Sequence, residues 1–451
     1  MADTWTAREA IGAVADPGSF TELVHSPRAR ESDGPLGWPG YDESIARAAK
    51  RTGERESVVC GTASVGGRRA VLISFEFGFL GGSLGAPTGD LLEAAFTTAR
   101  ERRTPLVSLI ATGGSRMQEG MRALTQLQRV TRQSALLRAA GVPQIAVARD
   151  PTTGGGWATL GAAADVVLAL PGAQVGFAGS RVRPPGADPA AYTAEAQLAT
   201  GQIDALVHPG ELRAALADWL LLLSGPRGAG TPEPPGAPVG GSPLATSGQE
   251  AVALARSAER PRAAAYLDAY FGGRVREISG DRCGGTDPGM RCGFGMHQGR
   301  TVAYAAQCGT ATRPAGYRTA TRLVSLADAL GIPVLTLIDT PGAANDAEAE
   351  RSGAGPAIAG LFLAMATARV PLTTLLIGEG GSGGALALAA PGNTWATPDS
   401  YFSVIAPEAA AAILKRDPDR IGETADQLRL RPHDLVELGV ARGVVSLVPP
   451  P

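Results

Sequence analysis

Residues 106–116, LVSLIATGGSR, and residues 334–343, VLTLIDTPGA, share one pattern, in which an apolar strand runs into a glycine turn. A second stretch of the same kind follows each of them: residues 144–156 read QIAVARDPTTGGG and residues 373–384 read TTLLIGEGGSGG. Short apolar runs bounded by glycine and proline are typical of buried strands, and a helical pattern follows each run. The sequence therefore predicts four strand–glycine–helix junctions in an α/β fold with largely buried strands.

The spacing of these junctions repeats between the two halves of the chain. The separation between Gly113 and Gly155 equals the separation between Gly342 and Gly383 to within one position. The shift that carries Gly113 onto Gly342 likewise carries Gly155 onto Gly383 to within one position. Self-similarity at a fixed offset predicts a duplicated domain.

A proline- and glycine-rich segment separates the halves. Residues 225–248, GPRGAGTPEPPGAPVGGSPLATSG, have no apolar period, which predicts an extended and poorly ordered linker. We expect a first domain at residues 1–224, this linker, and a second domain at residues 249–451. The chain of 451 residues is long enough for two large cores.

The composition argues against two classes of partner. Lys+Arg number 41 and Asp+Glu 43, and this formal net charge of −2 argues against nucleic-acid binding and against a basic membrane-binding surface. No apolar run approaches the ~20 residues that span a bilayer, and residues 1–9 lack the pattern of a signal peptide. The four cysteines fit neither a disulfide scaffold nor a zinc ribbon. We expect a cytoplasmic protein without a metal.

A strand–glycine–helix junction can stabilise negative charge. Glycines let the backbone turn sharply and leave N–H groups uncovered. The start of a helix adds unpaired N–H donors and about half a positive charge. Two junctions that face one another would aim two donors at one oxygen, which makes an oxyanion hole. Close helix–strand packing explains a single junction equally well, but four junctions at matched spacing favour the oxyanion hole.

Other interpretations of single motifs stay open. Residues 380–384, GGSGG, and residues 81–85, GGSLG, match the G-x-S-x-G pattern of the α/β-hydrolase nucleophile elbow. A hydrolase needs a later histidine, and His433 is the one candidate after Ser382. His433 fits a solvated helix cap equally well, and a hydrolase leaves the duplication unexplained.

Three charged residues near the junctions have alternative roles. Arg116 and Glu119 either position a substrate or pair with each other at the start of a helix. Asp339, at the end of a predicted strand, fits a turn or cap residue better than an acid catalyst.

The junctions lie in strings that closely resemble the carboxyltransferase components of acetyl-CoA carboxylase, in the crotonase-like superfamily. Most of residues 5–224 is similar to the β subunit and most of residues 255–446 to the α subunit. The strings are GTASVGG (61–67), FEFGFLGGSLGAPTG (75–89), ATGGSRMQEGM (111–121), DPTTGGGWA (150–158), VGFAGSRV (175–182), GQID (201–204), SGDR (279–282), AGYRTA (315–320), LIDTPGA (337–343), IGEGGSGGALAL (377–388) and YFSVIAPEAAAAIL (401–414). The resemblance implies two tandem crotonase-like (ClpP/crotonase) ββα-superhelix domains.

The resemblance also implies a reaction. Enzymes of this family transfer a carboxyl group from carboxybiotin to the α-carbon of an acyl-CoA, such as acetyl-CoA, through an oxyanion-stabilised enolate. Biotin is carried by a biotin carboxyl carrier protein and is carboxylated by a biotin carboxylase, so both proteins are implied partners. The acyl-CoA lies on the β-like half and biotin on the α-like half, and the implied assembly is a homodimer.

The family pattern implies roles for particular residues. Backbone N–H groups of Gly113 and Gly114 would hold the thioester or enolate oxygen, and those of Gly383 and Gly384 the ureido oxygen of biotin. The residues expected around the acyl-CoA are Gly82, Ser83, Arg116, Gly154, Gly155, Phe177, Ala178 and Gly179. The residues expected around biotin are Gly342, Ala343, Gly380, Gly381, Ser403 and Ile405.

Four departures from the family pattern bear on the substrate. No cysteines of a zinc ribbon precede Cys60, so no zinc is expected, and residues 309–317 are shorter than the family's basic loop. Asp90 and Glu93 stand where basic residues are usual, and Ser180 where proline is usual. They leave open an altered acyl group or an acyl carrier protein substrate. A malonyl-thioester decarboxylase with the same oxyanion holes, or an inactive crotonase-like binding scaffold, are the alternatives.

Overall fold

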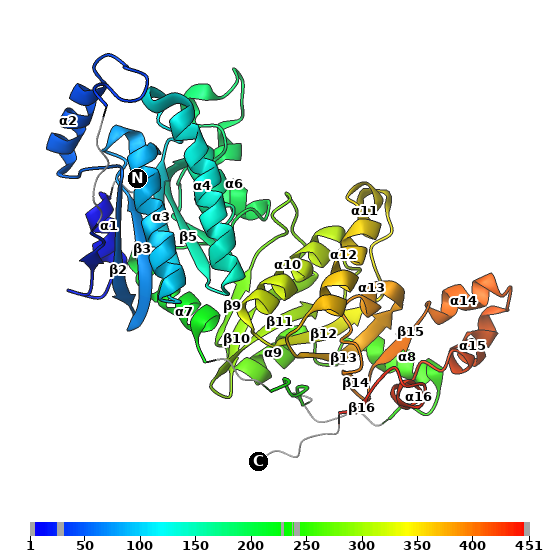
Figure 1. The fold of residues 1–451 in the computed structure, drawn as a ribbon. Helices are drawn as coiled ribbons and strands as arrows, with labels where there is room; N and C mark the ends of the chain where they lie inside the picture. Colours follow the sequence, from blue (N-terminus) through cyan, green and yellow to red (C-terminus); the bar gives the residue numbers. More distant parts are fainter. Residues whose placement is uncertain (1–4, 25–30, 227–229, 237, 239–243, 446–451) are drawn as a thin grey trace. The chain divides into compact units, whose positions relative to one another are not determined.

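The computed structural model describes residues 5–24, 31–226, 230–236, 238 and 244–445. The chain forms two compact units, residues 1–225 and residues 226–451. Each unit is a twisted sheet with helices packed on it, which confirms the predicted α/β fold (Figure 1). Within the described residues, no helix combines the length and the apolar character needed to cross a membrane.

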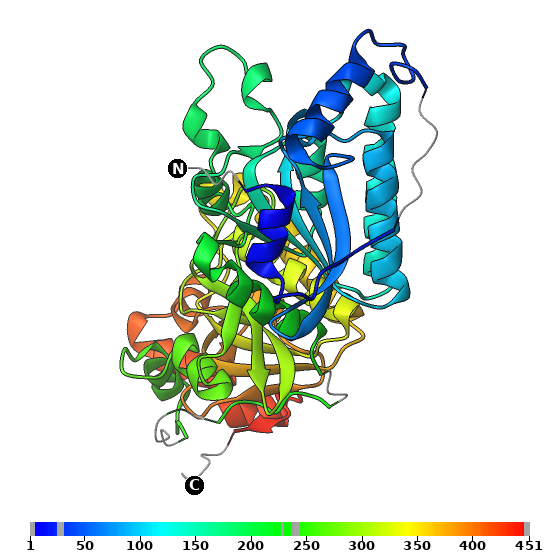
Figure 2. The same cartoon turned by 90° about the vertical axis from the view of Figure 1, so that its left-hand side faces the viewer.

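The first unit is built on an eight-stranded sheet of order β1-β2-β3-β4-β5-β6-β8, with β7 beside β5. Strands β3 to β6 run parallel, and β2 and β3 form an antiparallel hairpin. Helices α3 and α4 lie together on one face of this sheet, and α1 lies on the other face (Figure 2). The strands are β1 (Thr21–Glu22), β2 (Val58–Val65), β3 (Arg68–Phe75), β4 (Leu106–Thr112), β5 (Gln144–Thr153), β6 (Val166–Ala169), β7 (Val175–Gly176) and β8 (Ala205–Leu206). The α-helices are α1 (Ala7–Val14), α2 (Tyr41–Thr52), α3 (Ala86–Glu101), α4 (Gly120–Ala139), α5 (Gly154–Gly156), α6 (Ala194–Ala199) and α7 (Leu212–Ser224).

The second unit has the same topology, with strand order β16-β14-β13-β12-β11-β10-β9 and with β15 beside β13. Its strands are β9 (Val275–Ile278), β10 (Met290–His297), β11 (Arg300–Gln307), β12 (Val334–Thr340), β13 (Leu372–Gly381), β14 (Thr394–Ala396), β15 (Tyr401–Ser403) and β16 (Gly443–Val444). Its helices are α8 (Gly248–Arg256), α9 (Ala263–Phe271), α10 (Pro314–Leu330), α11 (Ala347–Arg351), α12 (Ala354–Thr367), α13 (Ser382–Leu386), α14 (Pro407–Ile413), α15 (Ile421–Gln427) and α16 (Pro432–Glu437).

The strand registers confirm the duplication and fix its offset. Leu106 lies opposite Gln144 in the first sheet, and Val334 lies opposite Leu372 in the second, so one shift carries both strands of the first pair onto the second pair. The same shift matches Gly342 with Gly114, whereas the sequence spacing had paired Gly342 with Gly113.

The hairpins also correspond, with a slightly larger shift. Val58 pairs with Phe75 in β2–β3, and Met290 pairs with Gln307 in β10–β11. The connection from the hairpin to the next parallel strand is therefore shorter in the second unit.

The N-terminal segment contains one short helix. Helix α1 ends before Pro17 and Gly18, which has a φ of +71°, because these two residues cannot continue a helix. The carboxylate of Asp16 then accepts hydrogen bonds from the N–H groups of Gly66 and Gly67 in the β2–β3 turn (2.9 and 2.8 Å). Helix α2 had no counterpart in the sequence patterns.

Part of the expected linker packs on the second unit. Arg300 Nη1 donates to Gly230 O (2.9 Å), and Thr373 Oγ1 donates to Pro232 O (2.6 Å). Pro232 and Pro235 are buried, although residues 231–236 contain neither helix nor strand. Residues 227–229, 237 and 239–243 of the expected linker lie outside the described residues. The described part is thus a strap on the surface of the second unit.

We expect Thr373→Val to lower the free energy of unfolding of the second unit by about 1–3 kcal/mol, because it removes the donor to the buried carbonyl of Pro232 and the acceptor of Asn393 Nδ2 (2.9 Å). Denaturation of the full chain by urea measures the change. Thr367→Val is the matched control, since the exposed Thr367 hydroxyl donates only to Leu363 O within α12. Equal effects of the two substitutions would show that the strap contributes no stability.

Candidate active site

Two loops of the first unit lie side by side at the carboxyl end of its parallel strands. The N–H of Gly113, after β4, donates to Gly81 O (2.9 Å), and the N–H of Leu84, before α3, donates to Gly114 O (2.9 Å). A side chain on Gly82 would overlap the backbone of β4, so only glycine fits there. The loops are therefore joined backbone to backbone.

The second glycine run of the first unit abuts the first one. A Cβ on Gly154 would lie 3.0 Å from Gly114 Cα, and the φ of +65° at Gly154 favours glycine. Helix α5 starts at Gly154, so the N–H groups of Gly155 and Gly156 belong to a first turn, where a helix offers no carbonyl partner. The structure thus brings together the two junctions that the sequence predicts to face one another.

The expected donors of this junction are already engaged. Gly113 N–H donates to Gly81 O, and Gly114 N–H donates to Thr112 Oγ1 (3.0 Å), so neither is free for a ligand as the family pattern implied. The N–H of Ser115, next along the chain, meets no protein acceptor within the described residues. At these two junctions the N–H groups without a stated acceptor are therefore those of Ser115 and of Gly155 and Gly156 at the start of α5, and not those of Gly113 and Gly114.

The second unit repeats two of these bonds, but Pro341 stands at the position of Gly113 and has no N–H to donate. Gly342 N–H donates to Thr340 Oγ1 (3.1 Å), as Gly114 N–H does to its threonine. Thr312 N–H donates to Gly342 O (3.0 Å), and Thr312 pairs with Ala343 in an isolated parallel bridge. The backbone around Gly342 therefore has the form of the Gly114 loop, and Ala343 takes the place of Ser115.

The helix starts also correspond. Ser382 has a φ of +56° where the first unit has Gly154 with a φ of +65°. The next two residues, Gly155–Gly156 in one unit and Gly383–Gly384 in the other, occupy equivalent positions of the repeat and lie in first turns of α5 and α13. The structure therefore pairs Gly383–Gly384 with Gly155–Gly156, and sequence reasoning missed Gly156.

The glycines of the two junctions differ in what a side chain would meet. Gly383 has no protein atom within 4 Å of an added Cβ, and Gly113 has only Gly81 O, at 3.4 Å. Gly179 similarly meets only Thr153, at 3.4 Å or beyond. Positive φ, or overlap closer than 3 Å with backbone or ring atoms, requires glycine at Gly82, Gly114, Gly154, Gly342, Gly380, Gly381 and Gly384, whereas a Cβ on Gly155 would meet only the movable Leu127 side chain. The fold itself does not require glycine at Gly113 or Gly383, where a side chain would enter open space.

Two family models cover the two units. The model described as "Carboxyl transferase domain" matches residues 3–205, and "Acetyl co-enzyme A carboxylase carboxyltransferase-like" matches residues 245–448. The chain is 38% identical to the acetyl-coenzyme A carboxylase carboxyl transferase subunits beta/alpha of Saccharopolyspora erythraea, over 97% of this chain and 79% of that protein. It is 41% identical to the protein of the same name from Salinispora arenicola, over 96% of this chain and 81% of that protein. The chain belongs to the acetyl-coenzyme A carboxylase carboxyltransferase family.

Solved structures confirm the tandem crotonase-like fold of this carboxyltransferase. Transcarboxylase 12S superposes with a TM-score of 0.78 at 23% identity, over 98% of this chain and 87% of that one. A single-chain, multi-domain long-chain acyl-CoA carboxylase superposes with a TM-score of 0.74 at 22% identity, over 98% of this chain and 46% of that one. Membership of this transferase family removes the hydrolase interpretation of residues 380–384. Among the described residues, no three His, Cys, Asp or Glu side chains are grouped to hold a metal ion.

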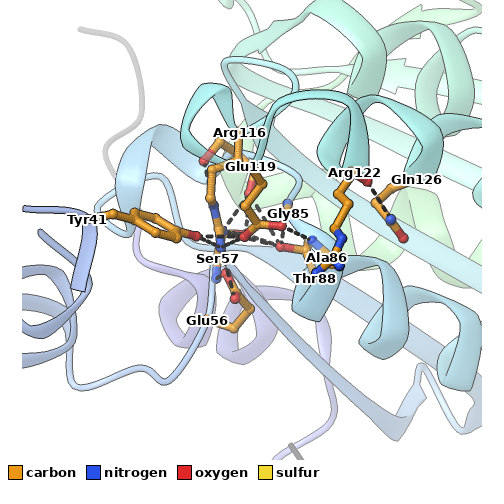
Figure 3. Close-up of polar contacts among 11 residues, drawn as sticks. Tyr41, Glu56, Ser57, Gly85, Ala86, Thr88, Arg116, Glu119, Arg122 and Gln126 are labelled. Atoms are coloured by element: carbon orange, nitrogen blue, oxygen red, sulfur yellow. Dashed lines mark hydrogen bonds and ion pairs between the residues drawn. The ribbon is translucent and has the colours of Figure 1, made fainter. Parts of the chain in front are cut away.

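Arg116 of the carboxyltransferase follows the Gly113–Gly114 turn and is buried in a cluster of polar side chains (Figure 3). Its guanidinium pairs with Glu56 and with Glu119 (3.3 Å), and Nη2 donates to Ser83 O (2.9 Å). Tyr41 Oη donates to the same Glu119 (2.6 Å). Arg116 thus pairs with Glu119, which is one of the two roles expected from the sequence, and its side chain is directed into the protein.

This cluster holds one positive and two negative side chains away from water. Burial alone would lower the pKa of the Arg116 guanidinium, but Glu56 and Tyr41 together raise the pKa above its usual value. Glu119 also accepts from the N–H of Ala86 (2.5 Å), at the positive start of helix α3, which offsets the second carboxylate. Burial raises the pKa of the Tyr41 phenol, which therefore stays a donor. No sequence pattern linked Tyr41 or Glu56 to the site, because their partners are distant in the chain.

Asp339 has a different role from the predicted turn or cap. Its carboxylate is fully buried at the end of β12 and pairs with Arg260 (2.6 Å) and Arg262 (3.2 Å). It also accepts the N–H of Glu379 (3.2 Å) in β13. Asp339 is therefore an internal ion-pair residue that joins the two strands leading to the second junction.

The remaining site residues lie beside the junctions. Gly154 N–H donates to Phe177 O (3.0 Å), which holds residues 177–179 next to α5, and the Phe177 side chain is 74% exposed. In the second unit Ser403 lies opposite Gly381 in the β13–β15 pair, and its hydroxyl donates to Ile405 O (2.6 Å). The structure thus places one such loop beside each helix start.

We expect Arg116→Met to lower the free energy of unfolding of the first unit by about 3–5 kcal/mol, because it leaves two buried carboxylates without their cation. Arg122→Met is the matched control: that side chain is exposed and pairs with the exposed Glu31, so its loss costs about 0–1 kcal/mol. Chemical denaturation measures both. A loss for Arg116→Met no larger than that of the control would contradict the buried network.

Proposed function

We propose that this carboxyltransferase moves a carboxyl group between carboxybiotin on a carrier protein and the α-carbon of an acyl-CoA, with acetyl-CoA and malonyl-CoA as the substrate pair. One observation carries the proposal: each unit presents a helix start with two successive glycines, Gly155–Gly156 and Gly383–Gly384, at the same place in the repeat. Two such starts supply N–H donors for two oxygens that gain negative charge. A biotin carboxylase and a biotin carboxyl carrier protein are the partners this reaction needs.

The first unit is suited to the acyl-CoA. Loss of an α-proton places negative charge on the thioester oxygen, and N–H donors aimed at that oxygen stabilise the enolate. We assign this role to Gly155, Gly156 and Ser115, because the N–H groups of Gly113 and Gly114 are engaged within the chain. The open space beside Gly113 is then room for the acyl-CoA.

The second unit is suited to biotin. Carboxybiotin supplies the carboxyl group and, after losing it, a basic ureido group. The N–H groups of Gly383 and Gly384 would donate to the ureido oxygen as it becomes more negative, with Gly342, Ala343 and the Ser403–Ile405 loop around the ring. The absence of any protein atom within 4 Å of a Cβ on Gly383 fits a planar ring approaching the backbone there.

The acidic departures from the family pattern do not leave free negative charge near the acyl-CoA. Arg129 pairs with Asp90 (3.0 Å) and with Glu93, and this contact lowers the pKa of Glu93. Asp90 and Glu93 thus replace two basic residues of the family pattern, but their negative charge is balanced by Arg129 and does not repel a CoA phosphate. We therefore keep a CoA thioester as the substrate in preference to an acyl carrier protein.

Turnover of malonyl-CoA tests the function. The wild-type chain should release CO2 from malonyl-CoA only when biotin or a biotinylated carrier is present. Release without biotin would instead favour the malonyl-thioester decarboxylase, and tight CoA-thioester binding without turnover would favour the inactive scaffold.

We expect Gly383→Ala to abolish most of this biotin-dependent turnover, by about 10²-fold or more, because the methyl group enters the space where biotin approaches. Its free energy of unfolding should stay equal or rise by up to about 1 kcal/mol, since alanine favours a helix. Gly384→Ala is the contrasting variant, because its methyl group overlaps the Ala343 backbone and should lower stability. An active Gly383→Ala enzyme would contradict the biotin site.

We also propose that two copies associate through apolar side chains near the junctions. Met117, just before α4, is 65% exposed, Met121 and Leu124 at the start of α4 are 67% and 46% exposed, and Leu363 on α12 is 65% exposed. Large exposed apolar groups of this kind mark interaction surfaces. The family's homodimer would bury them.

We expect Met121→Glu to shift the protein from dimer to monomer in sedimentation at micromolar concentration, because a carboxylate would be buried in the apolar contact. Arg69→Glu is the control and should leave the dimer intact. Arg69 is exposed near the amino end of β3, whereas the junctions lie at the carboxyl ends of the parallel strands. A Met121→Glu dimer as tight as the wild type would place the contact elsewhere.

A further inference from the structure

The carbonyl of Gly384 is bound by side chains from outside its helix. In a regular α-helix the N–H of Leu388 would donate to it, but that N–H donates to Ala385 O (3.1 Å). Gly384 O instead accepts from Gln307 Nε2 (3.2 Å) and from Tyr317 Oη (3.1 Å). Two side chains, at the end of β11 and in α10, therefore hold the first turn of α13.

Gln307 ties this turn to the neighbouring loop. Its Nε2 also donates to Thr312 Oγ1 (3.1 Å), and Thr312 N–H donates to Gly342 O (3.0 Å). One amide group thus links the start of α13 to Thr312, which in turn binds the Gly342 loop. The side chain is completely buried, so its position is set by these contacts.

The geometry of Gln307 is costly for stability. Its Oε1 is buried and meets no hydrogen-bond partner within the described residues. Leaving a buried acceptor unsatisfied costs about 1–3 kcal/mol. An apolar side chain would avoid that cost, so a polar side chain here points to a role other than stability.

The start of α13 cannot move closer to Tyr317. A Cβ on Gly384 would lie 2.7 Å from Tyr317 Oη and would overlap Ala343 N on the other side. The phenol is fully buried, and this burial raises its pKa, so the hydroxyl stays protonated and donates. Gly384 is therefore wedged between a donor and the backbone of the facing loop.

The first unit lacks both side chains. The hairpin registers place Phe75 at the position of Gln307, because each is the last residue paired with the start of its partner strand. The shift that carries β4 onto β12 places Gly89 of α3 at the position of Tyr317 in α10. Neither Phe75 nor Gly89 has a side chain that can donate a hydrogen bond. The duplicated backbone has thus acquired this polar clamp only in the unit that we assign to biotin.

We propose that Gln307 and Tyr317 are positioning residues for the biotin half of the reaction. By holding the carbonyl of Gly384, they fix the first turn of α13 so that the N–H groups of Gly383 and Gly384 meet the ureido oxygen as its charge grows. Neither side chain touches the ring. This inference rests on the proposed carboxyl transfer and names the residues that set its geometry.

Tyr317→Phe and Gln307→Leu in the full-length chain test the proposal, with biotin-dependent CO2 release from malonyl-CoA at varied concentrations of free biotin and malonyl-CoA as the readout. We expect kcat to fall by about 10–100-fold, as for displaced transition-state donors, while the KM for malonyl-CoA stays within about twofold. Tyr304→Phe is the matched control: this buried tyrosine of the same unit donates to Glu277 (3.0 Å), away from α13. It should keep the wild-type kcat.

The outcomes separate the two hypotheses. A Tyr317→Phe enzyme with the kcat of Tyr304→Phe overturns the positioning role, and so does a loss in which the KM for malonyl-CoA and the melting temperature change along with kcat. Because the two side chains bind one carbonyl, the double variant should lose less than the product of the single losses, and a full product contradicts the shared role. A wild-type chain that shows no biotin-dependent release overturns the proposed function itself. Since Tyr317→Phe removes a single oxygen, it keeps the test valid if Gln307→Leu does not fold.

Discussion

The structure depends on one constraint: a parallel strand must end in a loop whose backbone leaves N–H groups unpaired at the start of a helix. Gly154 and Ser382 meet it with positive φ. In the neighbouring loop of each unit, the N–H of Gly114 or Gly342 instead donates to a threonine hydroxyl of its own strand. These local bonds allow the start of α5 or α13 to pack against the Gly114 or Gly342 loop of the same unit. The rest of each unit, sheet and helices alike, keeps those two backbone segments in contact.

Both units support that contact with buried polar side chains, but with different ones. The first uses Arg116, whose guanidinium binds Ser83 O and two carboxylates, and the second uses Asp339 with two arginines and Gln307 with a threonine. A buried charged side chain and its partner must be present together, since a buried charge without a partner lowers the stability by several kcal/mol. The duplicated units have therefore kept one backbone geometry while replacing the network beneath it.

The sequence was sufficient for the four strands that lead to the junctions, for the duplication and for the location of the junctions, because apolar runs and glycines are local signals. It did not reveal that the N–H groups of Gly113 and Gly114, the expected donors of the first unit, are bonded within the chain, and our assignment to Ser115 and the start of α5 is a proposal made from the structure. Tyr41 and Glu56 were missed for a related reason: their contacts with Glu119 and Arg116 join segments that are far apart in the chain. Such partners follow from tertiary packing, which no short pattern encodes.

A catalytic group that belongs to the backbone responds to mutation differently from a side chain. Every residue except proline brings an N–H, so a single codon change rarely deletes a donor of α5 or α13. A mutation must instead move the N–H donor or block access to it. It can do so by adding a side chain at an open position such as Gly383, or by removing a supporting side chain such as Gln307. Variation in rate or in resistance to an inhibitor should therefore arise at packing residues around the helix starts, whose replacement alters the site by fractions of an ångström.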